Sequence, residues 1–225
     1  MGDPQLRDYK IVGGLEVFAD RSFWPNFFSR TVARLQWDPA AIDLSGLPSA
    51  PRQQRHARPF DRIGAEVLGL AGDTPVQRRA AARAYVPPAM LELFEVRLPA
   101  VAAELAAGRA GLSEGVGLYH MLLEGVVFDA GQHALLDDLE DDVLPGVRTG
   151  IERVERDERW HVGFGLRCLI ETKPSPELLE DLLARAEDAA DVWGDAVPEA
   201  VREHSARKVA HRLHVAKLLQ TPAAA

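Results

Sequence analysis

The chain has 225 residues, of which 47% are hydrophobic and 7% aromatic, and its formal net charge is −8. The acidic and basic residues are interspersed, which argues against nucleic acid as a partner because phosphate binding needs a concentrated positive surface. The single cysteine, Cys168, excludes an internal disulfide and suits a reducing compartment. No apolar run reaches the roughly 18 residues of a membrane span, and the first ten residues are polar, so we expect a cytoplasmic protein without a membrane segment or signal peptide.

The first 60 residues differ in character from the rest of the chain. Residues 10–36 contain five aromatic residues around Pro25 and suit either a short helix or an extended arm. The motif WDPAAIDLS follows at residues 37–45, and then a Pro/Ser/Gly-rich joint (46–51) and a basic run (52–58). The expected parts of the chain are an N-terminal arm or short helix (1–36), a single helical domain (37–220) and a tail (221–225).

Beyond residue 60, capping residues, prolines and glycines divide the chain into helices, and no stretch shows convincing strand alternation. Thr74 before Pro75 is a good helix start, since Thr caps and Pro suits the first helical position. Ser113 is a candidate cap for a long helix toward Glu140. The expected helices cover about 75–86, 89–107, 113–140, 145–172, 176–192 and 198–219. The sequence therefore predicts an all-α fold.

Two of these helices carry residues that suit a metal ion. Glu158 and His161 are three residues apart, so both side chains leave one helix face. Glu124 is a lone acid in an apolar run, where an unpaired carboxylate would be costly. A Glu on one helix and a Glu-x-x-His on the next form half of the ligand set of a carboxylate-bridged two-metal site in a four-helix bundle. A surface pair of Glu158 and His161 is the alternative, but the neighbouring Trp160 is apolar and favours a buried site.

These motifs, in this order, resemble the ribonucleotide reductase small-subunit family, including its ligand-binding oxidase branch. The residues that carry the resemblance are WDPAAIDLS (37–45), Leu-Glu-Gly (123–125) and RDERWH (156–161), and it extends over about residues 37–170. It implies a ferritin-like bundle that binds Fe or Mn. The metal ligands it implies in this chain are His56, Glu124, Glu158 and His161. It also places Trp37 and Asp157 on the family's radical-transfer route.

The sequence departs from the family in its second-helix motif. Gln53 stands where the family has a bridging glutamate, and Phe60 stands where radical-storing members have a tyrosine. Only residues 46–52 separate the first motif from this one, and seven residues cannot form a bundle-length helix at about 1.5 Å per residue. We therefore expect the bundle to be incomplete on its N-terminal side, with one ligand-bearing helix missing.

Tyr119 lies five residues before Glu124, a spacing at which the oxidase branch has a tyrosine that forms a crosslink to a valine of the first core helix. This match favours a redox role for Tyr119, and a packing role is the alternative. His120 shares a face with Glu124 and suits a supporting or core histidine better than a ligand. The resemblance implies an O2-dependent oxidoreductase. Because one helix is missing and only two carboxylate ligands remain, we expect the activity to be impaired and at most one metal to bind per chain. Its implied partners are a second copy of the chain, a large reductase subunit or a long-chain apolar ligand. The alternative is a non-catalytic remnant that serves only in association or in binding an apolar ligand.

Overall fold

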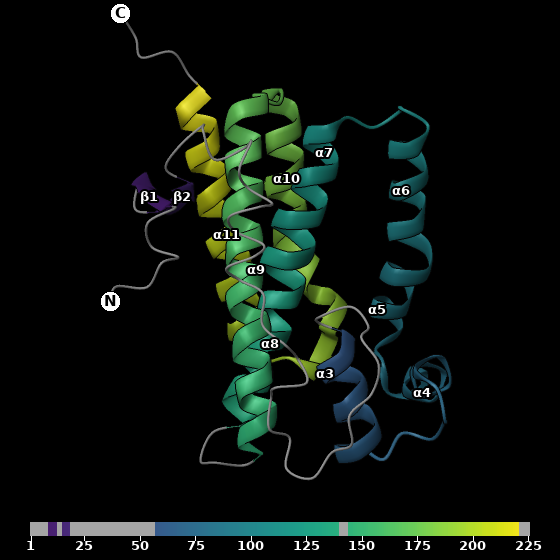
Figure 1. Ribbon diagram of the computed structural model, residues 1–225. Coiled ribbons are helices and arrows are strands. Elements are labelled where there is room, and N and C mark those ends of the chain that lie inside the picture. Colours follow the sequence, from purple (N-terminus) through teal and green to yellow (C-terminus); the bar gives the residue numbers. More distant parts are fainter. Residues whose placement is uncertain (1–8, 13–14, 19–56, 140–143, 221–225) are drawn as a thin grey trace, which may run out of the picture.

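The structure is a computed structural model that describes residues 9–12, 15–18, 57–139 and 144–220. This part of the chain is mostly helical, and its long helices form a bundle beside a separate helical arm (Figure 1). The expected all-α class and helical bundle are therefore confirmed. Labels with α denote α-helices; η4, η6 and η7 are π-helical, and η5 and η8 are 3-10 segments.

Two short strands near the N-terminus add to this pattern. β1 (Tyr9–Val12) pairs antiparallel with β2 (Leu15–Phe18), which lies beside the long helix α9 (Pro145–Thr172). Strands of four residues are too short to show a clear alternation. The pair Gly13-Gly14 between two apolar runs is nevertheless a sequence signal for a hairpin.

The first described helices are short. They are α3 (Ala57–Arg62), η4 (Ile63–Val67), α4 (Pro75–Ala82) and η5 (Arg83–Tyr85). Thr74 caps α4 as predicted: the backbone N–H of Gln77 donates to Thr74 Oγ1, and the backbone N–H of Thr74 donates to Gln77 Oε1. This reciprocal pair satisfies two N–H groups that the first helical turn cannot pair internally.

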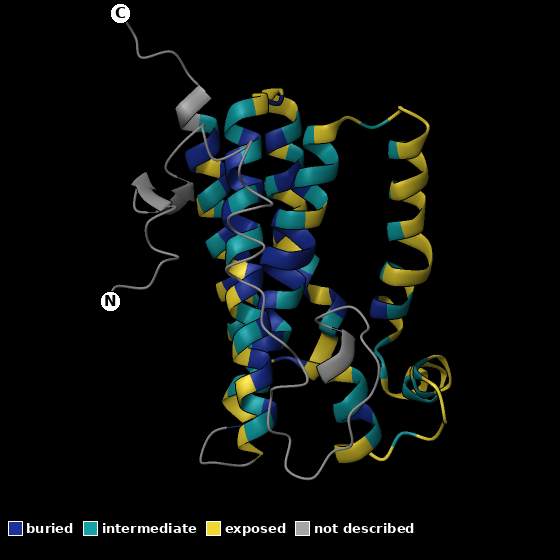
Figure 2. Cartoon of the chain, in the orientation of Figure 1, coloured by how far each residue is buried: buried dark blue, intermediate teal, exposed yellow. Residues whose placement is uncertain are grey.

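The next helical run is the arm, which consists of α5 (Pro88–Glu92), η6 (Leu93–Arg97) and α6 (Leu98–Ala106). It matches the predicted helix over 89–107. None of the nine residues of α6 is buried, although most of them are Ala, Leu or Val. Figure 2 shows this part of the molecule almost entirely in the exposed and intermediate colours.

Four helical runs build the bundle and its core. The first is continuous through α7 (Leu112–Val116), η7 (Gly117–Phe128) and α8 (Asp129–Asp138), and it packs against α9. The others are α10 (Pro176–Ala189) and α11 (Glu199–Gln220), which η8 (Ala190–Ala196) connects. The main core cluster draws apolar side chains from all four runs: Met121, Val126, Val162, Leu166, Leu169, Leu179, Leu182, Val209 and Leu213.

The first bundle run begins differently from the prediction. Its N-cap is Gly111 rather than Ser113, and Ser113 lies inside α7. The hydroxyl of Ser113 donates to Thr172 Oγ1 at 2.8 Å. Ser113 therefore ties the start of α7 to the C-terminal end of α9 instead of capping a helix. The boundaries of α9, with Pro145 at its start and Thr172 at its end, are those predicted.

Candidate metal site

Glu124 lies in the middle of η7 and is only 3% exposed. The apolar residues around it place this part of η7 in the bundle core, and the carboxylate enters the core with them. The whole segment Gly117–Phe128 is π-helical. Segments of this type are rare and frequently occur at functional sites. A buried carboxylate needs hydrogen-bond donors or a positive charge close to it, because an isolated buried carboxylate is strongly unfavourable.

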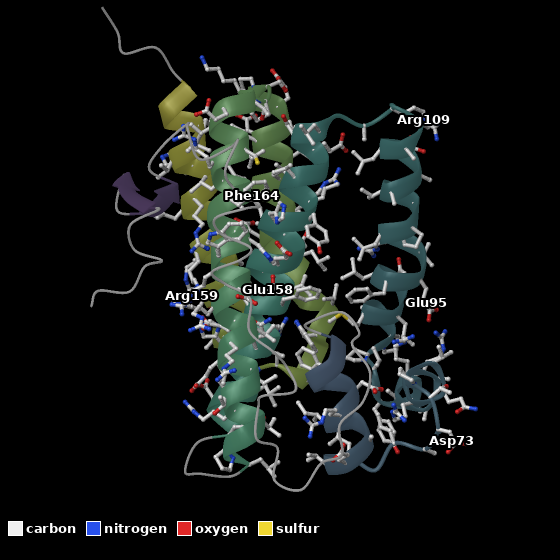
Figure 3. All side chains as sticks on the ribbon, in the orientation of Figure 1. Asp73, Glu95, Arg109, Glu158, Arg159 and Phe164 are labelled. Carbon is white, nitrogen blue, oxygen red and sulfur yellow. The ribbon has the colours of Figure 1, made fainter. Side chains whose placement is uncertain are left out.

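One compensating side chain is His161 of α9, and Glu158 of the same helix adds a second carboxylate to the site. His161 Nδ1 lies 3.2 Å from Glu124 Oε1 and 3.0 Å from Glu158 Oε2, and Glu158 is 7% exposed. One ligand atom from each of Glu124, Glu158 and His161 lies within 4.8 Å of the others, and this is the one such group of three or more found among the described residues. Figure 3 shows Glu158 on α9, at mid-height of the bundle. The structure thus brings three of the four predicted ligands together.

The two carboxylates control the protonation of His161. Burial disfavours its charged form, but hydrogen bonds to Glu124 and Glu158 and the charges of both carboxylates outweigh burial and raise the pKa of His161 from 6.5 to about 10. Without a metal, His161 is therefore an imidazolium that compensates part of the two negative charges. In this form of the site, the proton on His161 supplies positive charge between the two carboxylates, as a bound cation would.

His120 is a further residue of this site, for which the sequence favours a supporting or core position over a role as a ligand. Its Nδ1 lies 2.5 Å from Glu124 Oε2, and its ring packs edge to face against Tyr119 and Phe164. The sequence indicates the contact between His120 and Glu124, because residues four apart share a helix face. The sequence does not show the contact with Phe164, which comes from α9.

The other predicted site residues are placed differently. Tyr119 is 51% exposed, and partial burial together with the charges of Glu124 and Glu158 raises the pKa of its phenol. Asp157 is buried on α9. Neither belongs to the three-donor group, and their redox roles stay predictions. Trp37 and His56 lie outside the described residues.

The donor set suits a transition metal. Two ligands at about 2.1 Å from one ion lie about 3.0–3.4 Å apart for tetrahedral to octahedral angles. The observed nitrogen–oxygen distances of 3.0 and 3.2 Å fall in this range. Carboxylate and imidazole groups are common ligands of divalent transition metals. Three protein donors leave coordination positions for water or a substrate.

Comparison with known proteins gives no relative: no family model, curated protein or solved structure matches this chain. In the part of the chain that the structure describes, none of the helices has the length and apolar character needed to cross a bilayer.

Proposed function

We propose that this protein binds one divalent transition-metal ion through Glu124, Glu158 and His161 and acts as a metal-dependent oxidoreductase. The observation that carries the proposal is the meeting of two buried carboxylates and one imidazole, from two different helices, within 4.8 Å. Buried acids of this kind are rare unless they are paired or hold a cation. The class we propose is the one that the motifs resemble, the ribonucleotide reductase small subunits and their oxidase branch.

The residues of the chain have separate tasks in this proposal. Glu124 and Glu158 neutralise the charge of the ion with hard oxygen donors. His161 gives up its proton to become a ligand, and the surrounding bundle core keeps water from most of the site. A bound Fe or Mn ion would supply one-electron redox chemistry with O2 as the oxidant.

Metal titration of three proteins tests the proposal. Calorimetry with Mn²⁺ and anaerobic Fe²⁺ should show tight binding to the wild type and a loss of at least tenfold in affinity for Glu158→Gln. The matched control is Glu152→Gln on the same helix, because Glu152 pairs with Arg148 at the exposed surface. We expect the control to bind as the wild type does. Absence of metal binding by the wild type would overturn the proposal.

An oxygen electrode tests the redox part separately. The Fe²⁺-loaded wild type should consume O2 faster than free Fe²⁺ in the same buffer, and Glu158→Gln should not. Metal binding without accelerated O2 consumption would leave a metal-binding protein and remove the oxidoreductase assignment.

A second candidate is a non-catalytic protein that associates with a second copy or with an apolar ligand. The observation that favours it is the arm, where α6 is rich in apolar residues but has none that is buried, and where Val96 of η6 is largely exposed. Exposed apolar surface of this kind drives association. Sedimentation of the metal-free protein distinguishes the two: a stable dimer without metal binding supports this candidate.

A further inference from the structure

The two oxygens of Glu124 have different partners. Oε1 faces His161 at 3.2 Å, whereas Oε2 faces His120 Nδ1 at 2.5 Å. An ionised carboxylate only accepts hydrogen bonds, so with Glu124 in this form Nδ1 of His120 carries a hydrogen and donates a hydrogen bond to Oε2. One oxygen of Glu124 is thus held by an imidazole of its own helix, and the other is directed toward α9, where Glu158 and His161 lie.

The side chain of His120 is itself held in place from several sides. Gly165 of α9 lies against it, because a methyl group on Gly165 would collide with the Cβ of His120. The ring of Phe164, labelled on α9 in Figure 3, packs edge to face on the imidazole with centroids 5.4 Å apart. The ring of Tyr119 packs on it at 5.0 Å with a similar geometry. These contacts restrict the rotation of the imidazole and keep Nδ1 directed at Glu124.

From these contacts we propose that His120 is a positioning residue of the metal site. It donates a hydrogen bond to Oε2 of Glu124 and so holds the carboxylate with Oε1 facing His161, where an ion would bind. This inference rests on the proposed function, because it assigns a role toward the same ion. Groups that orient metal ligands by hydrogen bonds typically change metal affinity by about 10- to 100-fold when they are removed.

A consequence is that Glu124 binds through one oxygen. With Oε2 accepting the 2.5 Å hydrogen bond from His120, binding through both oxygens would make Oε2 share its lone pairs between the ion and the imidazole, which favours binding through Oε1. The site then presents three donor groups and keeps the rest of the coordination sphere open. His120 therefore acts on the number of ligands as well as on their direction.

Three variants of His120 test the role. The amide nitrogen of Asn reaches the position of the histidine Nδ1, whereas that of Gln reaches the position of Nε2. We expect His120→Ala and His120→Gln to weaken Mn²⁺ or Co²⁺ binding by about 10- to 100-fold, and His120→Asn to restore affinity to within about threefold of the wild type. Circular dichroism checks that each variant folds. If the Ala variant does not fold, the difference in metal affinity between the Asn and Gln variants tests the role of His120.

The visible spectrum of bound Co²⁺ adds a readout that separates positioning from ligation. If His120 only positions Glu124, the wild type and His120→Asn give the same absorption bands. A changed spectrum in His120→Asn would make His120 a ligand and overturn the inference. Equal affinity of the wild type, the Asn variant and the Gln variant would also overturn it while leaving the proposed function intact. A wild type that binds no metal would overturn both.

Discussion

Gly165 of α9 and His120 of η7 are in direct contact, and the contact exists because Gly165 has no side chain. A Cβ built on Gly165 would lie far inside the van der Waals distance of the Cβ and Cγ of His120. The two helices therefore approach each other closely at the level of the candidate metal site. A glycine within a helix lowers its stability by about 1 kcal/mol relative to alanine, and at this position the close approach explains its presence.

The first prediction concerns this contact. Gly165→Ala should destabilise the fold by about 1–3 kcal/mol, because the added methyl group must displace His120 or part the helices. The same change should weaken metal binding. The control is Gly115→Ala in α7, where the new methyl group meets only the end of the flexible Leu105 side chain. Urea denaturation should show the control at or above wild-type stability, and equal destabilisation of both variants would contradict the prediction.

The second prediction concerns the proton on His161. In the metal-free protein, imidazole NMR signals should give a titration midpoint for His161 of about 10, because Glu124 and Glu158 hold its proton. A divalent ion must displace this proton, so calorimetry at pH 7.5 in buffers of different ionisation enthalpy should show release of about one proton per ion bound. A midpoint close to 6.5 would contradict the electrostatic account of the site.

The same shift makes the stability of the metal-free fold depend on pH. The folded state binds the His161 proton more tightly than the unfolded chain, whose histidine pKa is about 6.5, so the protonated form stabilises the fold. This contribution is complete below about pH 6.5 and disappears as the pH rises through about 10. Denaturation of the wild type and His161→Gln should therefore give stabilities that converge over this range. A constant difference between them would show that His161 acts through packing alone.

The sequence predicts the helix starts and the metal-binding group, but it does not predict the contacts of His120 with α9. Pro145 and Thr74 mark the helix starts directly because capping and proline effects are local. The sequence predicts that Glu124 meets Glu158 and His161, because Glu158 and His161 share one helix face and the motifs resemble those of the small-subunit family. The contact of His120 with Phe164 and Gly165 does not follow, because it depends on how closely two helices pack. No local residue pattern indicates the π-helical winding of η7.

The third prediction concerns the single thiol. Burial raises the pKa of Cys168 from 9.0 to about 11, so the thiolate is scarce at neutral pH. Since the thiolate is the nucleophile, labelling of the native protein by iodoacetamide at pH 8 should be slower than labelling of the unfolded chain by at least tenfold. The rate in the native state should rise with pH up to about 11. Equal rates in the native and unfolded states would place Cys168 in an exposed environment.

The fourth prediction concerns a buried ionic cluster that joins α8 to α11. Asp129 accepts hydrogen bonds from Ser205 Oγ at 2.6 Å and from Lys208 Nζ at 2.7 Å. Lys208→Met should lower the free energy of unfolding by about 3 kcal/mol. This is the low end of the range for breaking buried ion pairs, because the lysine side chain is 28% exposed. Lys217→Met is the control, since its pair with Glu180 is exposed and should cost less than about 1 kcal/mol. Thermal unfolding that ranks the two variants equally would contradict the prediction.

The last prediction concerns the number of ions. Glu124 and Glu158 can neutralise one divalent ion, but two ions in the same place would retain a net charge of about +2, which is costly in an interior of low dielectric constant. Elemental analysis after loading with Mn and Fe should therefore give at most about one metal per chain. The variant Glu158→Gln is the control and should lose most of the bound metal. About two metals per chain, both lost in the control, would show that a further acidic ligand, from outside the described residues or from a second copy of the chain, completes a two-metal site.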